Sequence, residues 1–90
     1  MSKAEVIQKL EKSGYRLSEK RLRILEELYA VEQVVDMEGF WMTLRERYQI
    51  SWATVQTFLQ RLHSEGLLLR EYGDGRSIIY RVKGSLSHSG

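Results

Sequence analysis

The sequence contains no cysteine and only two histidines, His63 and His88. Without cysteine the chain cannot form disulfides, thiolate metal sites or a thiol nucleophile. Structural zinc sites need four nitrogen or sulfur ligands, and two imidazoles alone do not supply them. We therefore expect neither a bound metal nor another cofactor.

Long apolar runs are absent too. No stretch approaches the roughly 20 apolar residues of a membrane span, and residues 1–10 lack the apolar block of a signal peptide. The expectation is a cytoplasmic protein with no membrane partner. Paired carboxylates, a serine–histidine arrangement and a glycine-rich phosphate loop are also missing at catalytic spacing, so we do not expect an enzyme.

Neither sign of charge predominates, since the net charge is only +2 over 90 residues. A total this small argues only weakly for a nucleic-acid partner. The distribution is more informative: basic residues gather in segments 16–23 and 70–83, and acidic residues concentrate over 26–38. The length suits a single domain with one modest core and a polarised surface.

Apolar residues recur at three- and four-residue steps in four segments, which is typical of amphipathic helices. Ser18, Asp36 and Ser51 stand at the expected N-caps of the second, third and fourth helices. Gly14 and Gly66 follow the first and fourth helices, where a left-handed residue commonly ends a helix. The predicted helices cover residues 3–12, 19–31, 37–48 and 52–65.

After Gly66 the pattern changes to the alternation of strands, with Ile78, Tyr80 and Val82 expected on one face. The segment 73–75, Gly-Asp-Gly, tolerates the positive φ angles of a hairpin turn. We therefore predict a two-stranded antiparallel hairpin. The predicted domain covers residues 1–83, followed by a flexible polar tail over residues 84–90.

Three helices followed by a hairpin, with a tight turn between the last two helices, is the element order of a winged helix-turn-helix. The expected fold class is mainly α with a small antiparallel β-hairpin. In such folds the last helix lies in a DNA major groove. Here its apolar seam is opposed by short polar residues without a carboxylate, and its N-terminus at Ser51 offers amides suited to a phosphate.

Several short motifs occur together in the order found in one known family. They are residues 14–21 (GYRLSEKR) with Ile24-Leu25, residues 51–55 (SWATV) with Leu59 and Leu62, Gly66-Leu67, and Gly75 with Tyr80. Over roughly residues 3–83 the chain thereby resembles the N-terminal domain of ferric uptake regulators. The resemblance implies that residues 51–55 open the recognition helix and that Arg16 and its neighbours approach the DNA backbone or minor groove.

The chain departs from that family at two points. Gln56 and Thr57 stand where members usually carry tyrosine and a basic or polar residue, so the family's recognition sequence is not carried over. The family's second domain holds its histidine- and cysteine-rich metal sites and most of its dimer interface, and it is not found in these residues. Metal-dependent sensing is therefore not expected.

The prediction is sequence-specific binding of double-stranded DNA by a transcriptional regulator, with a homodimer or partner for tight binding. The predicted DNA contacts are Arg16, Lys20, Ser51, Trp52, Thr54, Gln56, Thr57, Gln60, Arg61 and Arg76. Trp52 can point either inward or toward DNA, and the polar helix face can also be an ordinary solvated surface. Two alternatives stay open: docking of the winged helix onto another protein, and binding of structured RNA.

Overall fold

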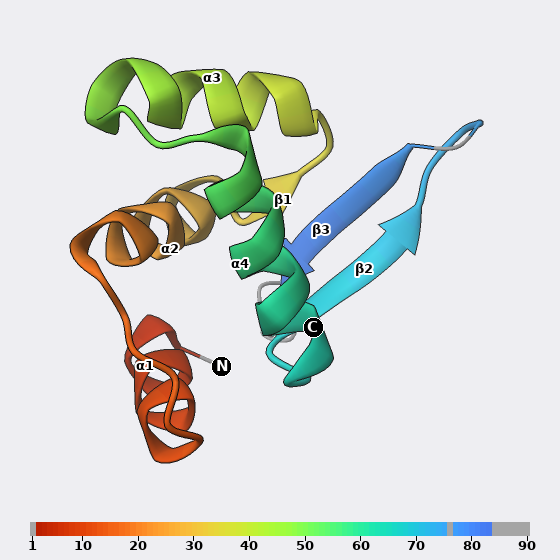
Figure 1. Cartoon of the computed structure of the whole chain (residues 1–90). Helices are drawn as coiled ribbons and strands as arrows, with labels where there is room; N and C mark the ends of the chain where they lie inside the picture. Colours follow the sequence, from red (N-terminus) through yellow and green to blue (C-terminus); the bar gives the residue numbers. More distant parts are fainter. Residues whose placement is uncertain (1, 76, 84–90) are drawn as a thin grey trace.

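The computed structural model describes residues 2–75 and 77–83, which form four helices and three strands. Figure 1 shows the helices gathered on one side of a small sheet, whose long hairpin projects away from them. In chain order the elements are α1 (Lys3–Lys12), α2 (Glu19–Val31), β1 (Gln33–Val34), α3 (Met37–Tyr48), α4 (Trp52–Ser64), β2 (Leu68–Tyr72) and β3 (Ile78–Val82).

Serine side chains start three of these helices. The hydroxyl of Ser18 accepts a hydrogen bond from the backbone N–H of Arg21 at 3.3 Å, and that of Ser51 accepts one from Thr54 at 3.2 Å. Ser2 caps α1 in the same way. Each such cap stabilises its helix by about 1 kcal/mol. Asp36 occupies the predicted N-cap of α3, but within the described chain its side chain makes no capping hydrogen bond.

The sheet has the strand order β1-β3-β2 and is antiparallel throughout. The predicted hairpin is confirmed as β2 and β3, whereas the short strand β1 was not predicted. Arg81 on β3 joins all three strands, since its guanidinium donates to the Gln33 side chain at 2.9 and 3.1 Å and to the Glu71 carboxylate at 3.0 Å. These side-chain hydrogen bonds lie on the outer face of the sheet and link β1 to the hairpin.

One hydrophobic core fills the space between the helices and the inner face of the sheet. The predicted seam of α4 is at its centre, with Val55, Phe58, Leu59 and Leu62 all buried. Tyr80 closes the core from β3, as its place in the alternating pattern predicted. Because one face of α4 is fully used in packing, its opposite face is left at the surface.

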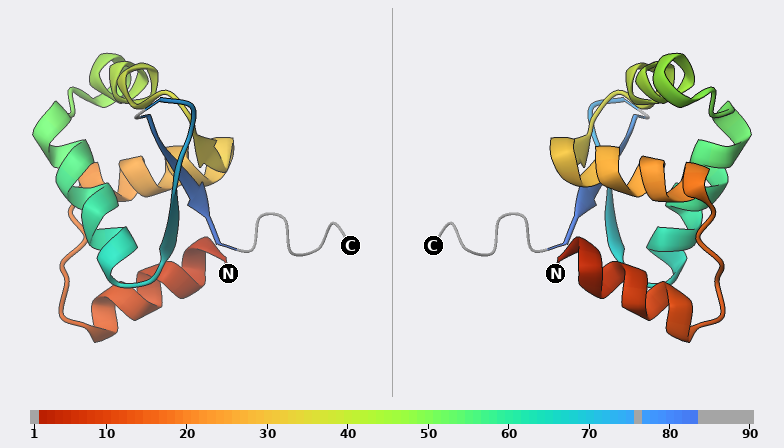
Figure 2. Two further views of the ribbon diagram at one scale, coloured as in Figure 1. Left: turned by 90° about the vertical axis from the view of Figure 1, so that its right-hand side faces the viewer. Right: turned by 90° about the vertical axis from the view of Figure 1, so that its left-hand side faces the viewer.

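This arrangement is a winged helix, as predicted: α3 and α4 form the helix-turn-helix, and β2 and β3 form the wing. The two side views of Figure 2 show α4 beside the sheet and α1 across one end of the molecule. None of the helices described here is long and apolar enough to cross a membrane.

Candidate nucleic-acid interface

The outward face of α4 is polar and free of acidic residues. Helical geometry, at about 100° per residue, centres this face on Ala53, Thr57 and Gln60, and all three are exposed. Gln56 lies at one edge and Thr54 at the other, and both are half-buried. Residues 52–64 include no aspartate or glutamate. The face therefore presents hydroxyl, amide and methyl groups without a charge that repels phosphate.

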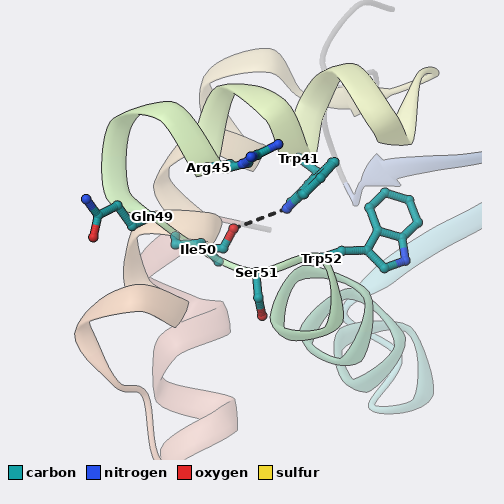
Figure 3. A pocket seen from close by; sticks show the side chains of 6 residues that line it. All are labelled: Trp41, Arg45, Gln49, Ile50, Ser51 and Trp52. Carbon is teal, nitrogen blue, oxygen red and sulfur yellow. Dashed lines mark hydrogen bonds between the residues drawn. The ribbon is translucent and has the colours of Figure 1, made fainter.

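The turn between α3 and α4 is held by tryptophan. The indole N–H of Trp41 donates to the Ile50 carbonyl at 3.1 Å, and the Trp52 ring meets Trp41 edge-on with centroids 5.5 Å apart. Trp52 nevertheless keeps 40% of its surface exposed. It therefore both packs against α3 and reaches solvent. These groups line an open pocket of about 380 Å³ together with Arg45, Gln49 and Ser51, shown in Figure 3.

On the other edge of α4, Tyr15 lies between two arginines. The guanidinium carbons of Arg61 and Arg21 lie 4.7 and 5.0 Å from the centre of the tyrosine ring. The ring itself stacks on the buried Phe58, with centroids 6.1 Å apart. Arg61 is also paired with Glu65, at 3.0 Å from Nε to the carboxylate. A phosphate that contacts Arg61 therefore competes with Glu65 for its charge.

The predicted contacts in the loop before α2 and in its first turn are solvent-accessible. Arg16 and Lys20 are exposed, and neither is in an ion pair with the described carboxylates. The Arg16 carbonyl accepts a hydrogen bond from Nη1 of Arg21 at 3.0 Å, so the loop that carries Arg16 is tied to α2. Arg76, predicted at the tip of the wing, lies outside the described residues.

The arginines of the described chain fall into two groups. Arg23, Arg47, Arg61 and Arg81 form ion pairs with carboxylates. No ion pair within residues 2–75 and 77–83 includes Arg16, Arg21, Arg45 or Arg70. Of this second group only Arg16 was predicted as a site residue.

Arg21 and Arg45 line the pockets on either edge of α4. Neither of them was predicted from the sequence as a site residue. A signal for them exists. Neither has an acidic residue three or four positions away along its helix, whereas Arg23 has Glu19 and Glu26, and Arg61 has Glu65.

No group of three or more histidine, cysteine, aspartate or glutamate side chains able to hold a metal ion occurs in the described part of the chain. His63 is half-buried near the end of α4, and His88 lies outside the described residues.

A winged helix whose last helix shows an acid-free polar face flanked by arginines has the features of a DNA-binding domain. Comparison with protein families agrees, because the model of the ferric uptake regulator family matches residues 12–89. The chain belongs to this family, as its motifs predicted, and so is a DNA-binding domain of the transcription-regulator class. A search of curated proteins finds no significant match.

Proposed function

We propose that this domain binds specific sequences of double-stranded DNA by placing α4 in the major groove. The observation that carries the proposal is the exposed, acid-free face of α4 around Thr57 and Gln60. A major groove about 12 Å wide admits one α-helix, and its phosphate walls disfavour carboxylates on that helix. The arginines around α4 that pair with no described carboxylate supply the attraction that a net charge of only +2 does not.

The side chains on this face suit base reading. Gln56 and Gln60 can bridge N6 and N7 of adenine through their amides, and Thr54 and Thr57 can offer methyl groups to thymine. A good bidentate contact gives about 1–3 kcal/mol of discrimination against the wrong base. Trp52, exposed at the edge, completes the proposed base-facing set.

Phosphate contacts position the helix in the groove. Ser51 lies at the start of α4, and its hydroxyl is 2.9 Å from that of Thr54. One phosphate can therefore contact both hydroxyls. We assign Arg16 and Lys20 to one flanking stretch of backbone and Arg76, which the sequence predicts at the hairpin tip, to the other. We assign Arg61 to a phosphate that displaces Glu65. These contacts are blind to sequence and weaken with salt.

Two further features belong to the proposal. A single domain of this size makes few base contacts, so we propose that specific binding involves two copies on a palindromic site. We also propose that this domain needs no metal ion to bind DNA, since its 90 residues contain no cysteine and two histidines.

One observation favours a different function, docking of a protein. Val31 and Val35 keep 46% and 55% of their surface exposed and line a groove with Phe40 between β1 and α3. Exposed apolar residues beside a groove are typical of protein contacts. This groove lies away from the acid-free face, so mutations there separate the two functions.

The test is binding to random-sequence duplex DNA at about 50 and about 200 mM salt, followed by selection from a randomised duplex pool. We expect measurable binding at the lower salt, a steep loss at the higher salt, and a palindromic winner. The same measurement on Val31→Ser should give parent-like affinity. Absence of binding at low salt would reject the proposal and favour docking of a protein.

A further inference from the structure

Two arginines that sequence patterns did not identify as site residues stand on opposite edges of the first turns of α4. Arg21, from α2, lines a pocket with Thr54 and Thr57. Arg45, from α3, lines the pocket that also contains Ser51 and Trp52, as Figure 3 shows. At about 100° per residue, Thr57 and Trp52 are about 140° apart around the helix axis. The two pockets therefore flank the outward face of α4.

Each of these guanidinium groups rests on an aromatic ring that is itself fixed. Arg21 lies over Tyr15, which stacks on the buried Phe58. Arg45 lies over Trp41, with its guanidinium carbon 5.4 Å from the ring centre. Because the rings restrict both side chains before binding, less conformational entropy is lost when a ligand arrives. A guanidinium over a ring face keeps N–H donors free at its edge, and two of them can bind an oxyanion through parallel hydrogen bonds.

Their charges are also not neutralised, unlike that of an otherwise similar arginine. Arg23 rests on the Tyr48 ring at 5.3 Å, but Glu26 and Glu19 lie 3.3 and 3.7 Å from its guanidinium. For Arg21 the described chain provides one hydrogen-bond acceptor, the Arg16 carbonyl, and no carboxylate. Arg45 has no described carboxylate partner either. Four described arginines lie over aromatic rings, and of these only Arg21 and Arg45 have no described carboxylate partner.

We infer that Arg21 and Arg45 are two phosphate clamps that hold the DNA backbone on the two walls of the groove entered by α4. In the Arg21 pocket, the Thr54 hydroxyl, 2.9 Å from that of Ser51, provides a further donor to the same phosphate. Tyr15 and Trp41 act as positioning residues. The inference rests on the proposed function, because it names how the same interface grips its DNA.

The experiment measures the slope of log affinity against log salt for Arg21→Gln, Arg45→Gln and the double variant, with Arg23→Gln as the matched control. Each phosphate contact contributes about 0.9 to the slope, so each single variant should lower it by about 1 and the double variant by about 2. Between about 50 and about 200 mM salt, each lost contact makes the salt-dependent fall in affinity about 3.5-fold smaller. Arg23→Gln should keep the slope of the parent.

Two further arms separate this inference from its rivals. Arg21→Lys and Arg45→Lys should keep most of the parent's slope, because lysine retains the positive charge although it cannot make two parallel hydrogen bonds. Titration with inorganic phosphate alone asks whether the pockets take a small free anion. Saturable phosphate binding that Arg21→Gln abolishes, with an unchanged DNA slope, would overturn the DNA assignment.

The outcomes also distinguish this inference from the proposed function. If the parent binds no DNA at low salt, the proposed function fails. If the parent binds DNA and the folded glutamine variants share the slope of Arg23→Gln, only the two clamps are refuted. Thermal unfolding of every variant confirms that the comparison is made between folded proteins.

Discussion

Replacing Ser51 by aspartate separates the folding role of this residue from its role at the interface. The Ser51 hydroxyl caps α4 by accepting the Thr54 amide at 3.2 Å, and it is exposed at the start of the acid-free face. Aspartate and serine are nearly equal as N-caps, and a negative charge is favoured at a helix N-terminus. We therefore expect the free energy of unfolding to stay within about 0.5 kcal/mol of the parent.

DNA binding should respond very differently. A carboxylate about 4 Å from a backbone phosphate is repelled by about 1 kcal/mol in bulk water and by about 4 kcal/mol at the effective dielectric of a protein surface. At about 1.4 kcal/mol for each tenfold change, the expected loss of affinity lies between about fivefold and several hundredfold. The lost phosphate contact of the hydroxyl adds to this loss.

The assay pairs urea unfolding with equilibrium binding to duplex DNA at low salt. Ser51→Asn is the neutral control, because asparagine caps as well as aspartate without the charge. Ser2→Asp repeats the same substitution at the N-cap of α1, which carries none of the proposed contacts. Equal DNA affinity for folded Ser51→Asp and Ser51→Asn would refute the placement of Ser51 beside phosphate.

Three other outcomes follow from the same structure. Glu65→Gln removes the partner of Arg61 and should raise DNA affinity up to about fivefold, since an exposed i,i+4 pair is worth about 0.2–1 kcal/mol. Unchanged affinity in a binding assay would contradict the proposed contact of Arg61 with phosphate. Chelation with EDTA should leave DNA affinity unchanged, and a loss reversed by added metal would contradict metal-independent binding by this domain. The backbone N–H of Ser2 donates to the Glu5 carboxylate and lowers its pKa, so the resulting stability is present above the ordinary glutamate pKa and disappears as pH falls through the lowered value. Glu5→Gln should remove that part of the pH dependence of unfolding, and an unchanged loss of stability at acid pH would argue against this hydrogen bond between Ser2 and Glu5.

The parts of the fold that sequence patterns predicted are those set by neighbouring residues. Ser18 and Ser51 cap helices through residues three positions later, and the seam of α4 follows from helical spacing alone. Strand β1 was missed because two residues carry no alternation. It forms only when Gln33 meets Arg81, 48 positions further along the chain.

The same distinction applies to the candidate site. The acid-free face of α4 is a property of one helix and could be predicted directly. Local spacing would also have separated Arg21 from the paired Arg23. It would have failed for Arg47, which lacks a local acidic partner but pairs with Glu27 of α2 at 3.7 Å. The ring support of Arg61 by Tyr15 likewise depends on tertiary packing, so no local pattern reveals it.

The placement of α4 in DNA is tested most directly by amide NMR of the labelled domain during titration with duplex DNA at low salt. We predict that the largest shifts occur at Thr54, Thr57 and Gln60 and in the turn before Ser51, and that they reverse as salt rises. Shifts confined to the groove around Val31 and Val35, with the α4 amides unmoved, would contradict this placement.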